Sequence, residues 1–199
     1  ALELQYLFDE ADADYSETIK LYPYHSHAFL RRGMIGLRKI ARMRLLGPLP
    51  KSAEAIESLP LETLIGPALV HAVEADRHIT EAHVNAFPLN GETRILFKTR
   101  NSRLLKKSAY DPDFVAFSEE ATRALVARGV KLVGLDYLSV AHEDAQIPVH
   151  RAFLDHGVVL LEGVDLSEIA PGRYELICFP IPLRGSDGAP CRAVLRDLR

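Results

Sequence analysis

The sequence predicts a single mixed α/β domain in which short helices alternate with buried strands. Two continuous apolar runs of strand length, residues 130–135 and 158–161, each follow a short predicted helix that ends in glycine. A third segment, residues 94–99, alternates with the period of two that is typical of a strand. The chain has 199 residues, 48% hydrophobic and 26% charged, which is the composition of a globular domain with a packed core.

The first half of the chain adds two helices and a strand to this pattern. Residues 30–46 carry apolar side chains at helical spacing, and a second helix is predicted over residues 52–58. A glycine–proline pair then precedes an apolar strand at residues 68–73.

Capping and turn residues predict the remaining elements. Thr80 is expected to cap a short helix, and Ser118 caps a longer one that ends before Gly129. Residues 100–117 between them are predicted to form a long loop. Near the C-terminus, strands at residues 174–179 and 192–195 are separated by a hairpin turn at residues 185–188.

Polar side chains stand where the predicted strands and helices meet. Asp136 follows the first apolar run, His150 lies near the start of the next helix, and Glu162 closes the second run. Open α/β sheets bind their ligands at such ends. His150 and Glu162 could therefore share a metal ion or a proton, or form a structural hydrogen bond only. Asp136 at a strand end is more typical of a cap or turn former than of a catalytic residue.

Basic residues are concentrated in one window of the chain. Residues 31–44 carry six basic and no acidic side chains, although the formal net charge of the whole chain is −3. Arg31, Arg38 and Arg42 form a stripe on the predicted helix, which could be a solvated face, an anion site or a surface for an acidic partner. Nucleic-acid binding is not predicted, because no aromatic stacking platform or second basic patch accompanies the stripe.

Cysteine content and hydropathy predict a cytoplasmic protein. Cys178 and Cys191 provide neither a disulfide framework nor the spacing of a metal site, which indicates a reducing compartment. We expect no membrane association, because no apolar run approaches the length of a spanning helix and the N-terminus lacks a signal-peptide pattern.

Seven segments together resemble the cyclase family of metal-dependent hydrolases, whose best-known members are the bacterial kynurenine formamidases. They lie between residues 58 and 195 and read SLPLETLIGPALV, ITEAHV, RILFKTR, VKLVGLDYLSV, HR at His150 and Arg151, LLEGVDLSEIAPGRYELICFPIPL and GSDGAPCRAVL. The resemblance implies a swivelling β/β/α domain, with mixed sheets and flanking helices. This single domain would span residues 1–199, with a divergent part at 1–50 and a family-like part at 51–199. It also implies a homodimer.

The resemblance further implies hydrolysis of an amide, formamide or lactone with the help of a zinc- or manganese-type ion. Such an ion lowers the pKa of a bound water and polarises the substrate carbonyl. In the family most metal ligands come from an N-terminal motif, His-x-Gly-Thr-His-x-Asp-x-Pro-x-His, and a later histidine and glutamate complete the set. His150 and Glu162 match this later pair, as metal ligands if a metal binds.

The N-terminal motif itself is absent from this chain. An ungapped count places Arg38, Arg42 and Arg44 at two histidine positions and the aspartate position. Arginine only donates hydrogen bonds and cannot ligate a metal. We therefore predict that these three arginines and Tyr137, which stands where the family usually has threonine, bind a small-molecule substrate or an anionic ligand.

His25 and His27 offer one alternative source of metal ligands. Two histidines two residues apart on a strand point to the same face, which is a usable ligand geometry. They could equally be polar residues on an aromatic edge. A metal site built on them would need an insertion of about a dozen residues before the family-like part, because they lie well upstream of the position that the ungapped count gives.

Three hypotheses about activity remain open at this point. The first is a metal-dependent hydrolase of the family type. The second is a metal-free cyclase or dehydratase in which His150 and Glu162 act as acid and base while arginines hold an anionic oxygen. The third is a non-catalytic relative that uses the fold for binding or assembly.

Overall fold

A closed barrel of seven strands dominates the computed structural model, which describes the backbone of residues 41–44 and all atoms of residues 55–107 and 110–198. The strands, in order around the barrel, are β1 (Ala41–Arg44), β7 (Val159–Glu162), β6 (Leu132–Leu135), β4 (Arg94–Lys98), β2 (Ile65–Ala72), β8 (Gly172–Pro180) and β9 (Gly188–Asp197). The described residues belong to one compact unit, Ala41–Arg199. The expectation of one domain over residues 1–199 stays a prediction, because residues 1–40 lie outside the described ranges.

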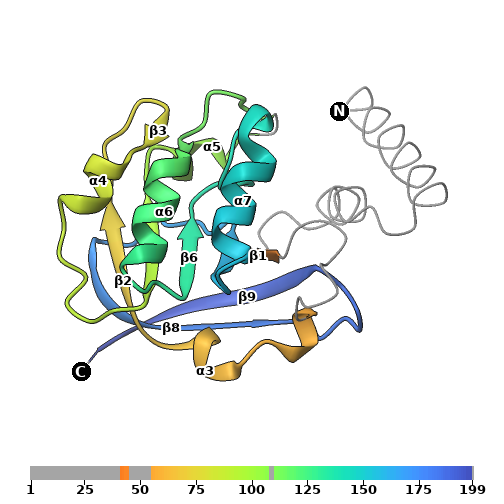
Figure 1. Cartoon of the computed structure of the whole chain (residues 1–199). Helices are drawn as coiled ribbons and strands as arrows, with labels where there is room; N and C mark the ends of the chain where they lie inside the picture. The colour runs from red at the N-terminus through yellow and green to blue at the C-terminus, as the bar shows by residue number, and fades with distance from the viewer. Residues whose placement is uncertain (1–40, 45–54, 108–109, 199) are drawn as a thin grey trace, which may run out of the picture. The chain divides into compact units, whose positions relative to one another are not determined.

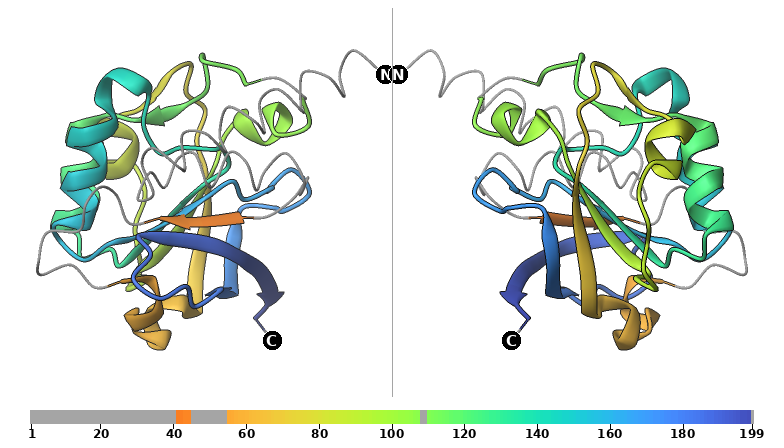
Figure 2. Two further views of the ribbon diagram at one scale, coloured as in Figure 1. Left: turned by 90° about the vertical axis from the view of Figure 1, so that its right-hand side faces the viewer. Right: turned by 90° about the vertical axis from the view of Figure 1, so that its left-hand side faces the viewer.

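The parallel half of the barrel is covered by helices. Strands β2, β4, β6 and β7 pair in parallel, and α4 (Glu81–Asn85), α6 (Glu119–Ala127) and α7 (Gln146–Leu154) lie side by side over their outer face. Figures 1 and 2 show these three helices on the same side of the strands. Strands buried on both faces need apolar residues at every position, which explains the two continuous apolar runs in the sequence.

Alternating side chains of the parallel strands pack into two separate hydrophobic cores. Leu96 and Leu161 pack inside the barrel, whereas Ile95 and Leu160 pack under the helices. Because strand side chains alternate between faces, the residue after Leu161 returns to the helix side of the sheet. That residue is Glu162.

The antiparallel half is made by β8 and β9, which cross below the parallel strands in Figure 1. Their inward side chains include Cys178 and Cys191, which are buried and free. Burial raises the pKa of both thiols to about 12, so they stay protonated near neutral pH. The helix α3 (Leu61–Leu64) leads into β2 at this end of the barrel.

The predicted helix over residues 30–46 is wrong at its C-terminal end. Ala41–Arg44 forms β1, which pairs antiparallel with β7 on one side and with β9 on the other. The rest of that segment lies outside the described residues. Two open strand edges present unpaired backbone donors and acceptors, and pairing with both of them outweighs the local helical pattern.

The predicted loop over residues 100–117 is also wrong in part, because it contains α5 (Asn101–Leu104) and β5 (Ala116–Phe117). β5 pairs in parallel with β3 (His78–Ile79). The Asn101 side chain donates to the Val115 carbonyl and accepts from the Val115 amide, both at 2.7 Å. The side-chain amide of Asn101 thus bonds the Val115 backbone as a neighbouring strand would. Residue patterns do not reveal such a contact.

Other predicted boundaries hold more closely. The hydroxyl of Thr80 caps α4, and the hydroxyl of Ser118 accepts from the Ala121 amide at 3.2 Å to cap α6. The predicted helix over residues 52–58 is represented among the described residues by a single 3₁₀ turn, Ile56–Ser58. None of the helices in the described ranges combines the length and the apolar character that crossing a bilayer requires.

Candidate functional site

The C-terminal end of β7 meets the middle of α7 at a buried histidine–glutamate pair. Glu162 is the last residue of β7, on the helix side of the sheet, and His150 lies on the face of α7 that also buries Val149 and Phe153. Both paired side chains are 0% exposed. The separation between His150 Nε2 and Glu162 Oε1 is 3.4 Å. The structure therefore brings together the two residues that the sequence singled out.

Backbone groups fix the orientation of both members of the pair. His150 Nδ1 lies 2.7 Å from the Gln146 carbonyl oxygen, one turn earlier in α7. A carbonyl oxygen can only accept, so Nδ1 carries a hydrogen and Nε2 is the atom that faces Glu162. The Val140 amide donates to Glu162 Oε1 at 2.9 Å.

The 3.4 Å gap suits a shared proton or a metal ion. A neutral His150 with hydrogen on Nδ1 presents a lone pair to a carboxylate oxygen, and two acceptors do not attract each other. A proton would satisfy both atoms, although the gap exceeds the usual length of about 2.7–3.2 Å. Two ligands of a tetrahedral zinc ion, each about 2.0–2.1 Å from the metal, would lie roughly 3.4 Å apart.

The donor set for a metal is incomplete among the described residues. Histidine nitrogen and glutamate oxygen are both good zinc ligands, and catalytic zinc sites use three protein ligands. The described part of the chain holds no group of three or more histidine, cysteine, aspartate or glutamate side chains that could bind a metal. His25 and His27 lie outside the described ranges. Among the described residues, His150 and Glu162 thus supply two of the three ligands that such a site needs.

The described part of the basic window, residues 41–44, reaches the same part of the barrel through its backbone. Arg42 is the Cα partner of Glu162 in the β1–β7 pairing, and Arg44 is the partner of Leu160. Arg38 lies outside the described residues. The ligand-binding roles of these three arginines stay predictions.

Tyr137 is anchored by Asp111 and Phe114. Its side chain is 1% exposed, and its hydroxyl accepts from the Asp111 amide at 2.8 Å. Its ring packs against Phe114, with 4.6 Å between the ring centroids. These contacts describe a packed core residue, and its ligand-binding role stays a prediction.

Asp136 organises a neighbouring turn. Its carboxylate accepts four hydrogen bonds of 2.7–3.0 Å, from the amides and hydroxyls of Thr99 and Ser102. Burial raises the pKa of Asp136, and the hydrogen bonds oppose that rise. These contacts join the end of β4 to α5, which matches the turn-forming alternative for this residue.

Sequence reasoning missed two residues that support the pair, Val140 and Gln146. Val140 acts through its amide and Gln146 through its main-chain carbonyl, so neither contribution depends on residue type. The side chain of Gln146 is also bonded within the loop that carries Val140. No residue pattern in the sequence predicts such backbone contacts.

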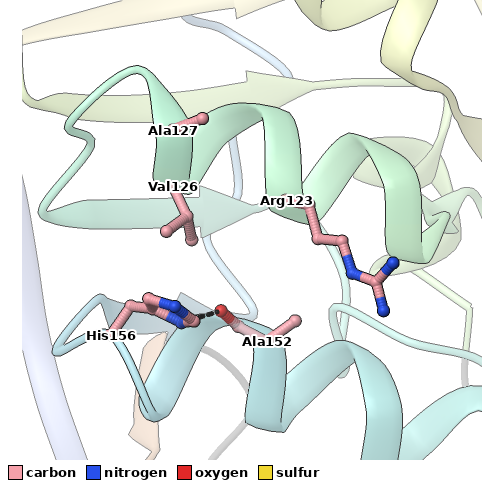
Figure 3. A pocket seen from close by; sticks show the side chains of 5 residues that line it. All are labelled: Arg123, Val126, Ala127, Ala152 and His156. Carbon is pink, nitrogen blue, oxygen red and sulfur yellow. Dashed lines mark hydrogen bonds between the residues drawn. The ribbon is translucent and has the colours of Figure 1, made fainter.

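A hollow of about 420 Å³ lies between α6 and α7, away from the pair. Figure 3 shows Arg123, Val126 and Ala127 on one side and Ala152 and His156 on the other. His156 Nδ1 lies 3.0 Å from the Ala152 carbonyl, the same one-turn contact that His150 makes. His156 is exposed, however, and faces no carboxylate partner in this hollow.

The barrel has the fold of a class of proteins described as metal-dependent hydrolases. Two solved structures share it: one described as a potential metal-dependent hydrolase with cyclase activity has a TM-score of 0.71 and 28% identity, with 79% of this chain and 78% of that chain covered. The second is isatin hydrolase A from Labrenzia aggregata, with a TM-score of 0.64 and 16% identity. The match covers 78% of this chain and 71% of the isatin hydrolase chain, and it shows the fold alone.

Residues 39–142 match the family described as putative cyclase, and the chain belongs to that family. It is 41% identical over 145 residues to cyclase-like protein 3 of Oryza sativa subsp. japonica, covering 70% of this chain and 54% of the relative. It is 39% identical over 149 residues to a kynurenine formamidase of Salinibacter ruber, covering 74% and 70%. The chain thus spans about half the length of the rice relative and more of the bacterial one.

Proposed function

We propose that this chain acts on the carbonyl group of a small amide, formamide or lactone, with His150 and Glu162 as its proton-transfer pair. The observation that carries the proposal is the fixed orientation of His150, whose Nδ1 is held by the Gln146 carbonyl while Nε2 faces Glu162 at 3.4 Å. The similarity to a kynurenine formamidase supports a formylated aromatic amine as the first substrate to test.

Each member of the pair has a distinct task in this proposal. His150 Nε2 takes a proton from the attacking water and later returns one to the leaving group. Glu162 stabilises the imidazolium that forms in between, and its own charge is stabilised by the Val140 amide. The burial of both side chains strengthens these interactions.

Chemistry at a divalent metal is an alternative, but the described residues do not provide a complete set of metal ligands. A zinc- or manganese-type ion would supply an activated water and polarise the carbonyl. It would need donors beyond His150 and Glu162, and none of the steps above uses it. The predicted anion-binding arginines, Arg38, Arg42 and Arg44, would hold a negatively charged substrate in either case.

Turnover of an aryl formamide by the purified full chain tests the proposal. Gln in place of His150 is expected to lower kcat/KM by about 10²–10⁴-fold, because it removes the proton carrier. His156→Gln is the matched control, since His156 makes the same contact to a carbonyl one turn earlier but faces no carboxylate in the hollow that it lines. Equal activity of the two variants would rule out His150 as the proton carrier.

Chelator treatment separates the two sources of chemistry. Activity that survives a chelator and elemental analysis without stoichiometric metal support the metal-free pair. Activity that disappears and returns with added zinc or manganese shows that donors outside the described residues complete a metal site.

A non-catalytic role is the second candidate, because the pair is 0% exposed. In that case His150 and Glu162 would only join α7 to β7, and the fold would serve binding or assembly. No turnover on formamides, amides or lactones, combined with a loss of stability in His150→Gln, favours this candidate. Homodimer formation and a cytoplasmic location stay predictions, which sedimentation analysis and cell fractionation would check.

A further inference from the structure

Gln146 contacts both His150 and the loop that carries Val140. Its main-chain carbonyl accepts from His150 Nδ1. Its side-chain nitrogen Nε2 donates to the Ser139 hydroxyl at 3.0 Å and to the Ala141 carbonyl at 2.7 Å. Because a carbonyl oxygen only accepts, the end of the Gln146 side chain that faces Ala141 must be the NH₂ group.

The two residues bonded by the Gln146 side chain flank Val140 in sequence. The Ser139 hydroxyl also accepts from the Ala141 amide at 3.3 Å, which closes a small turn around Val140. On its other side, the Val140 carbonyl accepts from the Phe117 amide at 2.9 Å. The Val140 peptide is thus held from both sides, and its amide points at Glu162 Oε1.

We infer that Gln146 is a positioning residue for the pair. Its carbonyl sets which nitrogen of His150 faces Glu162, and its side chain holds the Val140 amide against the carboxylate. We name the contacts of Gln146 with Ser139 and Ala141 the Gln146 clasp. Gln146 is half-buried and acts through these contacts, so its effect on turnover rests on the proposed function.

Two substitutions break the clasp in different ways. Gln146→Met keeps the length of the side chain and removes its donors. Gln146→Glu keeps the shape but turns an acceptor toward the Ala141 carbonyl, so it is expected to be at least as damaging. Ile147→Met is the matched control on the same turn, because Ile147 is 71% exposed.

Hydrogen exchange of the Val140 amide measures the clasp without any substrate. In the wild type, local opening that exposes the Val140 amide requires the Gln146 clasp to break. Gln146→Met lacks the clasp, so we expect exchange at Val140 to become at least about tenfold faster. Exchange at Leu96, a buried position in β4, reports global opening and is expected to change less. Unchanged exchange at Val140 would overturn the inference.

Kinetics give the second readout. If the chain turns over an aryl formamide, Gln146→Met is expected to lower kcat about 10- to 100-fold while KM changes little, as for other residues that orient catalytic groups. A rise in KM with kcat unchanged would contradict a positioning role. If the wild-type chain shows no turnover, the proposed function fails, but the exchange measurement still decides whether Gln146 holds Val140.

A smaller perturbation covers the case in which Gln146→Met does not fold. Ser139→Ala removes one acceptor of the clasp and leaves the Gln146–Ala141 contact in place. It is expected to change Val140 exchange in the same direction with a smaller amplitude. No change in this variant counts against the clasp.

Discussion

The Cα atom of Arg42 in β1 lies opposite that of Glu162, the last residue of β7. The same pairing joins Met43 to Leu161, so the described part of the segment at which the family motif is missing, residues 41–44, runs along the strand that ends in the candidate site. Arg42 and the His150–Glu162 pair, more than a hundred residues apart in the chain, therefore lie at one corner of the barrel.

Arg42→Ala tests whether Arg42, which pairs with Glu162 across β1 and β7, binds a ligand at the candidate site. If Arg42 binds the charge of an anionic substrate, its loss is expected to raise KM for that substrate about 10- to 100-fold. KM for a neutral analogue should stay the same. Arg151→Ala is the control, because Arg151 is exposed on α7 and paired with Asp155. Equal effects on charged and neutral substrates would rule out the anion-binding role.

Glu162→Gln tests the electrostatic part of the pair. The amide keeps the shape of the carboxylate but removes the charge that stabilises a protonated His150, so kcat is expected to fall by about 10²-fold or more. Comparison of the pH–rate profiles of the wild type and the variant is the measurement. A profile and rate identical to those of the wild type would contradict the role of Glu162.

Asp136→Ala should destabilise the fold rather than alter chemistry. The substitution leaves four buried donors of Thr99 and Ser102 without their acceptor, and each unsatisfied group costs about 1–3 kcal/mol. Urea denaturation is expected to show a loss of at least about 3 kcal/mol, given partial access of water to the opened turn. A loss below about 1 kcal/mol would show that the turn rearranges at little cost.

Gly134→Ala probes the contact between β6 and β4. A Cβ atom at residue 134 would lie 2.2 Å from Leu96 Cδ2, so the Leu96 side chain has to move. We expect a cost of about 1–3 kcal/mol from this overpacking. In the double variant with Leu96→Ala, the two effects should be less than additive, because the smaller side chain makes room. Additive losses in a double-mutant cycle would contradict this explanation.

The acid sensitivity of the fold should depend on two histidines near the surface of the helical layer. Burial lowers the pKa of His71, which stacks on Phe87 with 3.8 Å between ring centroids. Burial, the nearby His142 and then Arg77 lower the pKa of His78, while Asp144 opposes the shift. Both folded values lie below the unfolded value of about 6.5, so the unfolded state binds more protons and stability falls as the pH drops below that value.

His71→Phe separates this effect from general acid denaturation. The variant keeps a ring on Phe87 and cannot be protonated, so its stability should fall less between pH 7.5 and pH 5.5 than that of the wild type. Urea midpoints at the two pH values measure the difference. An equal fall in both proteins would show that His71 does not titrate in this range.

The sequence alone predicted the mixed α/β class, the caps at Thr80 and Ser118, and the two residues of the pair. These rest on local signals: hydrophobic runs, capping side chains and family-like flanking residues. Its main errors were the C-terminal end of the predicted helix over residues 30–46 and parts of the predicted loop over residues 100–117. In both, pairing partners far away in the chain decide the conformation, β7 and β9 in one case and β3 in the other.

Periodicity and residue type thus determined which segments are buried and which residues carry titratable groups. Tertiary structure decided what those groups face. The distance from His150 to Glu162 depends on how α7 packs on β7, and their orientation depends on backbone atoms of Gln146 and Val140. Every residue except proline has the same backbone amide and carbonyl, so the residue types in the sequence do not predict these backbone contacts.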